Sequence, residues 1–459
     1  MTYPFSIVRG AACYTKLSRL IGPRRSDNGQ PTTTTVAHDP YAALRSRDYS
    51  CLLAGNILAS VGSEMLSVAI GWELWLRTGS AANLGLVGLV EFLPVLLLAL
   101  PAGHAADRYN RKVQLVASQA GMLAAALGLA ALSFLQGPLP LVYSCLLLVG
   151  VSQAFGAPAR WSLVPQTVPE QDLGNAVTWN SSGWQIASVL GPALGGGVIA
   201  YAGGAAYAYL LAAGCAVACA SLVVAIRPRP FIRPMEEVSL KSLLAGIGFV
   251  WRTKLILATI TLDLFAVLLG GATALLPIFA SDILQVGPVG LGWLRAAPSL
   301  GALAMAVVLA HRPPLRRAGR TLLGAVAGFG AATIVFGLSK NVVLSFIALA
   351  VTGALDNISV VVRGTLVQLL TPDAMRGRVS AVNSIFIVSS NELGAFESGM
   401  TASWFGPIAS VVGGGIGTLL VVLGVLLLWP QVMALGSLQA PQQTEPAPEE
   451  WQRDKQARA

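Results

Sequence analysis

The chain has 459 residues, of which 54% are hydrophobic and only 11% are charged, and its mean hydropathy is +0.67. Soluble globular domains carry about 25% charged residues, so this composition excludes an ordinary soluble fold. Many apolar stretches reach the length of about 18 residues or more that crosses ~30 Å of hydrocarbon. The net charge of +9 does not indicate a nucleic-acid surface, because the cations collect in alternate loops and not in one patch. We therefore predict an all-α polytopic membrane protein.

The chain begins with a basic leader, residues 1–47, whose apolar content is too low for a signal peptide. Its composition predicts a mostly disordered tail. Twelve apolar spans follow, at residues 51–76, 83–105, 113–135, 139–159, 176–201, 204–226, 255–280, 288–311, 321–338, 341–362, 379–402 and 405–429. We therefore expect an N-terminal six-helix bundle (48–226), a linker (227–254), a C-terminal six-helix bundle (255–429) and a C-terminal tail (430–459).

The distribution of cations predicts the orientation of these spans. If the amino terminus is cytoplasmic, the even-numbered loops and both tails hold 27 of the 30 Lys and Arg residues. The opposite loops hold only Arg77 and Lys340, and Arg295 lies within a span. This asymmetry predicts that both termini lie in the cytoplasm. In the linker, apolar residues recur at helical spacing between Leu240 and Val250, which predicts an interfacial helix.

An internal repeat supports two related halves. A shift of 203 positions superposes eight similar or identical residues of the first half on the second. The pairs are Arg160 with Arg363, Pro169 with Pro372, Glu170 with Asp373, Gly174 with Gly377, Asn180 with Asn383, Ser181 with Ser384, Gly191 with Gly394 and Gly196 with Gly399. A parallel repeat of six helices is typical of a two-bundle transporter.

The charged turn between the second and third spans has the pattern G-x-x-x-D-R-x-x-R-K, formed by Gly103, Asp107, Arg108, Arg111 and Lys112. In residues and position it resembles the signature loop of the major facilitator superfamily. The fifth span carries Gly191-Pro192-Ala193-Leu194-Gly195-Gly196, which is similar to the antiporter motif of drug-efflux members, although Ala187 replaces one of its glycines. A close-packed, kinked helix is the structural alternative for this motif.

Two further segments resemble the branch of that superfamily that includes enterobactin exporters and macrolide-efflux proteins. They are Arg160–Pro165, which is followed by Asn175-Ala176, and Thr371–Arg378. The resemblance covers residues ~48–430. It implies two pseudo-symmetric six-helix bundles and secondary active export of a small amphiphilic molecule, drug-like or siderophore-like, and it does not name the molecule.

Charged residues within the spans are costly unless they are paired or hydrated, and so they are candidates for function. They are Glu64, Glu91, Asp263, Arg295, Asp356, Glu392 and Glu397. The carboxylates outnumber the one cation, and an unpaired desolvated carboxylate can load and release a proton near neutral pH. We rank Glu64 or Glu91 first as the coupling acid, then Asp263, then Glu392. The alternative for each is a hydrogen-bonded structural acid.

Substrate contacts are expected from other residues of the spans. Arg295 and Asp356 are candidates for a counter-charge or for binding a charged substrate group. Four aromatic residues are candidates for lining an apolar cavity: Phe92, Trp184, Phe265 and Phe386. Four arginines at the expected inner interface are interpreted as holding the two bundles in register: Arg160, Arg363, Arg376 and Arg378. Asp107 is expected to latch the first bundle to the second in the outward-facing state.

The sequence gives less support to a metal-binding protein, an ATP-driven transporter or an enzyme. The five cysteines and three histidines have no metal-ligand spacing, and a nucleotide-binding P-loop is absent from the sequence. We expect no cofactor, no disulfide and no nucleic-acid partner, with transport driven by an ion gradient, most simply of protons. A functional monomer in the bacterial inner membrane, with a small molecule and the bilayer as partners, is the resulting prediction. Uptake or facilitated diffusion, and a membrane scaffold or receptor, are the alternatives; an enzyme lacks a convergent set of catalytic residues.

Overall fold

The computed structural model describes residues 39–229, 240–312, 317–372 and 375–436. The chain divides into two units, Met1–Ala42 and Ala43–Ala459. Only residues 39–42 of the first unit are described, and there the Tyr41 amide donates to the Asp39 carboxylate at 3.0 Å. Predictions for tail residues 1–38 and 437–459, for linker residues 230–239 and for Asp373 lie outside the described residues.

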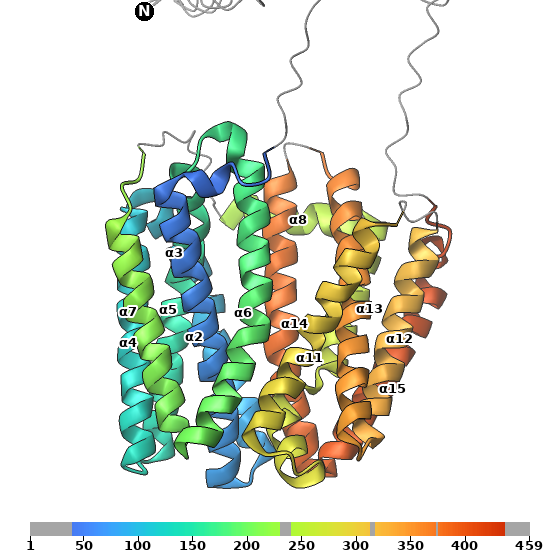
Figure 1. Cartoon of the computed structure of the whole chain (residues 1–459). Coiled ribbons are helices and arrows are strands. Elements are labelled where there is room, and N and C mark those ends of the chain that lie inside the picture. Colours follow the sequence, from blue (N-terminus) through green and yellow to red (C-terminus); the bar gives the residue numbers. More distant parts are fainter. Residues whose placement is uncertain (1–38, 230–239, 313–316, 373–374, 437–459) are drawn as a thin grey trace, which may run out of the picture. The chain divides into compact units, whose positions relative to one another are not determined.

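In the second unit the helices follow the order of the predicted spans (Figure 1). The six helices of the first half are α2 (Arg47–Thr78), α3 (Ala81–Arg108), α4 (Arg111–Phe134), α5 (Leu139–Leu163), α6 (Leu173–Ala202) and α7 (Ala205–Ala225). The linker helix is α8 (Leu240–Arg252), and the second half contains α9 (Lys254–Gly270), α10 (Leu276–Ile278), α11 (Gly287–Ala310), α12 (Ala318–Leu338), α13 (Val342–Leu370), α14 (Arg376–Phe405) and α15 (Pro407–Leu428). The short turns are η1 (Ala43–Arg45), η2 (Val164–Gln166), η3 (Glu170–Asp172), η4 (Ala272–Leu275), η5 (Phe279–Ile283) and η7 (Pro430–Val432).

The helices are joined by short connections, and side-chain or glycine caps lie at several of the helix ends. The Ser46 hydroxyl accepts a hydrogen bond from the Tyr49 amide at the start of α2, and Gly79 ends that helix with φ +58°. Asn110 caps α4 by accepting from the Lys112 amide at 3.0 Å. Such caps satisfy backbone groups that a helix end leaves without a partner. We call the end of the helices where α2 begins the near end and the opposite end the far end.

Eleven helical segments of the described chain are long and apolar enough to cross a membrane. The long helix α14 is not among them, because Ser, Asn and Glu residues spread along its 30 residues lower its mean hydropathy. Its length of about 45 Å, at 1.5 Å per residue, still exceeds the hydrocarbon thickness, so we treat α14 as the twelfth span. Its polar residues are explained by what it contacts, as described below.

The seventh predicted span, 255–280, is not one continuous helix. The helix α9 ends at Gly270, and the chain continues through η4, α10 and the π-helical turn η5. Gly271 has φ −74° and ψ 80°, outside the helical region, and Pro277 provides no amide hydrogen for a helical bond. These two features explain the break, which the hydropathy of the span does not reveal.

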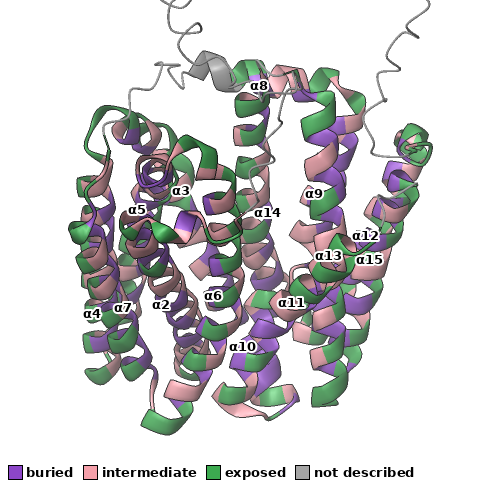
Figure 2. Ribbon diagram, turned by 45° about the horizontal axis from the view of Figure 1, so that its top comes forward, coloured by how far each residue is buried: buried purple, intermediate pink, exposed green. Residues whose placement is uncertain are grey.

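Burial follows the membrane-protein pattern (Figure 2). The buried residues are mainly Ala, Gly, Val and Leu at contacts between helices. Large apolar side chains are exposed along the same helices, such as Leu97 at 66% and Leu427 at 73%. Helices that are apolar on every side belong in a bilayer, where small residues allow close packing and large ones face lipid.

The two halves meet at two glycine-rich helix crossings close to the far end, which we call the far-end seams. At the first, Gly196 of α6 packs against Pro288 and Gly292 of α11, and at the second, Gly399 of α14 packs against Gly85 of α3. The 203-residue repeat superposes Gly196 on Gly399. Residues related by the repeat thus occupy equivalent crossings, as pseudo-symmetric halves require.

Candidate functional site

Charged side chains from four helices meet where the two halves contact each other. Arg295 of α11 forms an ion pair with Glu64 of α2, with 4.0 Å between Nε and Oε2. The Arg295 guanidinium also donates to the Ser67 hydroxyl at 2.7 Å. Ser67 was not among the sequence candidates, although its position three residues after Glu64 places both on one face of α2. Arg295 thereby connects α2 of the first half to α11 of the second.

Two more carboxylates belong to this group. The charges of Glu392, Arg295 and Glu64 all act on Glu91 of α3, and the charge of Arg295 acts on Glu392 of α14. A Cβ placed on Gly88 would lie 3.2 Å from the Glu392 carboxylate oxygen. Glu392 therefore approaches α3 one turn from Glu91, across the second far-end seam. We call Glu64, Glu91, Arg295 and Glu392 the central charge cluster.

The central charge cluster holds three carboxyl groups and one guanidinium. Arg295 can balance only one negative charge, and ionised carboxylates at short range repel one another. The remaining carboxyl groups need water or protons to neutralise them. Three of the four sequence-predicted coupling acids thus lie together with the predicted counter-charge Arg295.

The fourth predicted coupling acid, Asp263, lies elsewhere and already has a counter-charge. Its carboxylate forms an ion pair with Arg363 of α13 and accepts a hydrogen bond from Ser359 at 3.3 Å. Two sequence-based interpretations are therefore wrong. Asp263 is not an unpaired carboxylate, and Arg363 links two helices of the second half and does not connect the two bundles. The reason is that α13 extends to Leu370, which places Arg363 inside a membrane helix and not at its end.

Loss of one partner of this pair is expected to destabilise the fold. Replacing Arg363 with Met leaves Asp263 as a buried charge without compensation, which typically costs about 3–5 kcal/mol. The double variant Asp263→Leu/Arg363→Met removes both charges and should recover most of the stability. Thermal unfolding of the purified variants in detergent measures both effects. Equal midpoints for Arg363→Met and the unmodified protein would contradict the importance of this pair.

The remaining substrate candidates are spread over several places. Asp356 and Asp263 line a cavity of about 10 Å³, which is too small for a substrate. Phe92 is buried at 6% exposure. Phe265 and Phe386 line one apolar pocket of about 340 Å³ between α8, α9 and α14, and Trp184 lines a separate pocket of about 420 Å³ in the first half. Only Phe265 and Phe386 are therefore brought together.

The signature loop ties the near ends of three helices of the first half together. Lys112 donates to the carbonyl oxygens of Val224 and Ile226, at 2.7 and 2.8 Å, where α7 ends. The Arg111 guanidinium donates to the Ala106 carbonyl at 3.0 Å at the end of α3. Cations at these positions satisfy the last carbonyl groups of a helix.

The other members of this loop make fewer contacts. A Cβ added to Gly103 would meet no atom within 4 Å, so this glycine does not serve a close helix approach in this conformation. Asp107 and Arg108 are exposed, and within the described part of the chain neither forms an ion pair. The latch role of Asp107 stays a prediction about another conformation.

The antiporter-like motif packs α6 against α2 and α11. A Cβ on Gly191 would meet the Cβ of Glu64, and Gly195 packs against Met65 of α2. Gly196 and the Pro192 carbonyl contact Gly292 of α11. The motif therefore holds Glu64 in position beside a far-end seam. Its proline is accommodated in a continuous helix.

Two of the arginines assigned to the inner interface lie at the first turn of α14. Arg376 is exposed, and Arg378 points a guanidinium nitrogen to the Met375 sulfur at 3.5 Å. Arg160 lies near the end of α5 and lines the pocket that contains Trp184. Its described surroundings include no carboxylate partner, so the expected charge pair between bundles is absent there.

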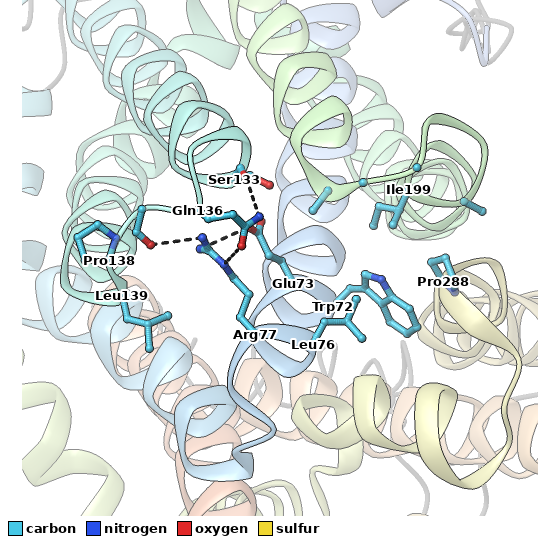
Figure 3. Close-up of a pocket in the computed structure, with 15 residues that line it drawn as sticks. Trp72, Glu73, Leu76, Arg77, Ser133, Gln136, Pro138, Leu139, Ile199 and Pro288 are labelled. Carbon is cyan, nitrogen blue, oxygen red and sulfur yellow. Dashed lines mark hydrogen bonds and ion pairs between the residues drawn. The ribbon is translucent and has the colours of Figure 1, made fainter.

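Sequence analysis missed a polar group at the far end, which surrounds a pocket of about 850 Å³ (Figure 3). Arg77 pairs with Glu73 at 3.4 Å and donates to the Gln136 side chain and the Gly137 carbonyl, both at 3.3 Å. The charge of Glu73 also acts on the Tyr209 hydroxyl of α7. These contacts fasten α2 to α7 and to the connection between α4 and α5. Since every nitrogen of Arg77 is engaged in them, we assign this group a structural role.

Metal ions are held by groups of His, Cys, Asp or Glu side chains. No group of three or more His, Cys, Asp or Glu side chains there is placed to hold a metal ion. Cys51, Cys145, Cys215 and Cys219 are free thiols.

Comparison with known proteins identifies related sequences over most of the chain. The family model described as "transmembrane secretion effector" matches residues 38–454. The enterobactin exporter EntS of Shigella boydii serotype 18 is 28% identical over 384 residues, covering 83% of this chain and 91% of the relative. EntS of Escherichia coli O81 is 29% identical over the same shares.

Solved structures of transporters have the same fold. A bacterial homolog of the human lysosomal transporter Spinster, inward-facing and unoccupied, has a TM-score of 0.61 at 15% identity, covering 87% of this chain and 96% of that one. A POT family transporter in complex with a thioalcohol-conjugated peptide has a TM-score of 0.65 at 11% identity, with coverages of 84% and 96%. The fold is that of the major facilitator superfamily, as the signature loop and the repeat predict.

Proposed function

The chain belongs to the transmembrane secretion effector family of the major facilitator superfamily, and from this premise we propose that it is a proton-coupled exporter of a small amphiphilic molecule. Membership of this family makes it a multi-pass secondary transporter. The observation that carries the proposal of proton coupling is the central charge cluster, where three carboxyl groups share one arginine between the two halves. A group that changes its protonation there can influence how the halves contact each other.

The orientation in the membrane follows from the cations. The predicted near-end loops and both tails carry 27 of the 30 Lys and Arg residues, and the structure moves Arg363 out of this set into α13. The asymmetry that remains favours a cytoplasmic near end and cytoplasmic termini. The bacterial inner membrane is the matching location, as for an exporter related to those of Escherichia coli and Shigella. The far-end seams then lie toward the periplasm. Their close packing supports assignment of this conformation to an inward-facing state.

Alternating access is the mechanism that this arrangement supports. In the inward-facing state the far-end seams are closed, and separation of α3 from α14 and of α6 from α11 opens the outer side. That motion also moves Glu392 away from Glu91, because they lie on opposite sides of one seam. The proton affinity of the cluster then differs between the two states, which is the thermodynamic requirement for coupling.

The substrate that we propose is siderophore-like or drug-like, in keeping with the enterobactin exporters among the relatives. The pockets that contain Trp184, and Phe265 with Phe386, offer aromatic surface to an amphiphile. The transport cycle needs a proton gradient and no cofactor, enzymatic step or nucleic acid. A monomer in the bilayer is sufficient, because both halves of the site come from one chain.

Everted membrane vesicles test this proposal. Vesicles with and without the protein are energised, and accumulation of enterobactin is measured before and after the pH gradient is collapsed. Accumulation that requires both the protein and the gradient is the expected result. Accumulation that continues after the pH gradient is collapsed would exclude proton coupling. Loss of substrate from preloaded vesicles would favour the alternative of uptake into the cell. If enterobactin is not accumulated, drug and siderophore sensitivity of a deletion strain identifies the substrate for the same assay.

Substitution of Asp107 by Asn is expected to slow transport without weakening substrate binding. Asp107 is exposed in the conformation described, so its partner is expected in the outward-facing state, where the near end closes. Loss of one latch contact of about 1–2 kcal/mol would change the ratio of the two states by roughly 5- to 30-fold. Initial rates and substrate affinity are measured with Glu170→Gln, an exposed near-end acid, as the control. An unchanged rate in Asp107→Asn would exclude the latch.

A further inference from the structure

A pocket of about 420 Å³ lies between α2, α5 and α6 in the first half. It contains one cation, Arg160, with the indole rings of Trp161 and Trp184, each 57% exposed. Five polar side chains complete the lining: Asn56, Ser60, Asn180, Ser181 and Gln185. Asn56, Asn180 and Ser181 already donate within the protein, to the Asn180 side chain and the carbonyl groups of Ala176 and Val177 respectively. Among the described contacts of these five side chains, Ser60 and Gln185 are therefore the donors that a ligand can use. No carboxylate is among the described residues that line it. The pocket thus combines positive charge, aromatic surface and hydrogen-bond donors.

Arg160 has no counter-charge in this pocket. Its Nε is buried and has no hydrogen-bond partner within the part of the chain that the structure describes. The titratable group recorded as acting on it is the thiol of Cys219, which does not carry the full negative charge of a carboxylate. A buried cation without a counter-ion is costly, and a bound anion removes that cost.

The internal repeat explains why the counter-charge is missing. The 203-residue shift that superposes Arg160 on Arg363 also superposes Ser60 on Asp263. In the second half Asp263 and Arg363 neutralise each other as a buried ion pair. In the first half the acid is replaced by serine, and both Ser60 and Arg160 line the pocket. One half therefore fills this position with its own carboxylate, and the other leaves it open.

We propose that this pocket binds an anionic group, a carboxylate or a comparable oxyanion, of the amphiphile that the protein exports. Arg160 supplies the charge and a planar donor set, and Trp161 and Trp184 pack against the apolar part of the ligand. This inference rests on the proposed export function for the identity of the ligand as a substrate. Ser60 lies one helical turn from Glu64 on α2, so the bound anion is close to the central charge cluster.

The charge at position 60 provides the test. Ser60→Asp recreates the ion pair of the second half inside the pocket, and Ser60→Asn introduces a side chain of the same size without charge. The two fluorescent probes are dansylglycine, which carries a carboxylate at neutral pH, and dansylamide, which is its neutral counterpart. Binding of each probe is measured by fluorescence with the full-length purified protein in detergent.

Ser60→Asp is expected to bind dansylglycine about tenfold more weakly than Ser60→Asn does, which is the size of one charge-assisted hydrogen bond. The two variants should bind dansylamide with equal affinity. Arg160→Gln should lower the affinity for dansylglycine to that for dansylamide, and its unfolding temperature is checked against that of the unmodified protein. Equal binding of dansylglycine by Ser60→Asp and Ser60→Asn would overturn the proposal, as would equal affinity of the unmodified protein for the two probes.

Failure of this inference is separable from failure of the proposed function. If the variants bind dansylglycine alike while the vesicles still accumulate substrate with the pH gradient, the anion site is wrong and the exporter stands. If the charge at position 60 controls probe binding but substrate accumulation does not depend on the pH gradient, the anion site is supported and proton coupling is wrong.

Discussion

Replacement of Glu91 with glutamine is expected to reduce gradient-driven export strongly while leaving exchange of substrate across the membrane intact. The expected loss of gradient-driven accumulation is about 5- to 150-fold, the range that a coupling free energy of about 1–3 kcal/mol covers. Glutamine keeps the shape of the side chain and removes its ability to carry a proton. The measurement is accumulation in energised proteoliposomes beside counterflow without a gradient, because counterflow needs the conformational cycle and not the proton.

Glu91 is placed first among the acids for a structural reason. Glu64 has Arg295 at 4.0 Å, whereas no ion pair is recorded for Glu91 in the described structure. Glu91 faces Glu392 across a seam that opens in the proposed transport cycle, and the backbone of α5 packs against Glu91 at Gly150. Glu91 therefore stays fixed in the first half while its carboxylate neighbour moves with the second.

The control for this experiment is Glu397→Gln. Glu397 is on α14 with Glu392, and the described side chain that acts on it is Ser398, outside the central charge cluster. It should retain coupling. If Glu91→Gln, Glu64→Gln and Glu392→Gln all retain gradient-driven accumulation at normal expression, the central charge cluster is not the coupling site. If Glu91→Gln also loses counterflow, the residue is needed for folding or conformational change and not for coupling alone.

Hydropathy was sufficient to predict the order of the helices, and their ends mostly agree within a few residues. It was insufficient where the backbone departs from a helix, at Gly271, because glycine and proline also occur in continuous membrane helices such as α6. The hydropathy criterion that finds the other spans does not include α14, but its polar residues have a clear origin. Glu392 contacts the first half, and Arg376 and Arg378 lie at the near end.

The site was predictable as a set of residue types and not as an arrangement. The cost of a charge within a span identifies Glu64, Glu91 and Glu392, but their proximity depends on helices far apart in the sequence. The pairing of Asp263 with Arg363 was missed because the tenth span was predicted to end at residue 362, eight residues before α13 ends at Leu370, which left Arg363 in a loop. The 203-residue repeat already indicated that positions 60 and 160 correspond to positions 263 and 363. The absence of a counter-charge for Arg160 can be inferred from this correspondence only once the ion pair between Asp263 and Arg363 is known.

Replacement of Gly196 with leucine is expected to prevent closure of the far end and stop transport. A Cβ at this position meets the Pro288 carbonyl and lies 3.1 Å from the Cα of Gly292, and backbone atoms of α11 cannot move aside without moving the helix. Overpacking of this kind costs roughly 1–3 kcal/mol. Because the cost falls only on the state with a closed far end, it shifts the population toward the outward-facing state by about 5- to 150-fold.

The neighbouring residue supplies a matched control. Gly197 is on the same turn of α6, and a Cβ added to it meets nothing within 4 Å. Gly197→Leu gains the same helix propensity as Gly196→Leu, so a difference between them reports contact with α11 alone. Spin labels at the exposed residues Tyr201 of α6 and Val289 of α11 measure the opening, because these helices separate at the far end.

We expect a longer distance between the labels in Gly196→Leu than in Gly197→Leu, together with a transport rate reduced by at least about tenfold. Gly399 occupies the equivalent position at the other seam, against Gly85 of α3, so Gly399→Leu should reproduce both effects. If Gly196→Leu transports as fast as Gly197→Leu with an unchanged label distance, the seams are not the outer gate. An effect in Gly196→Leu without one in Gly399→Leu would mean that the two related halves do not share the closure equally.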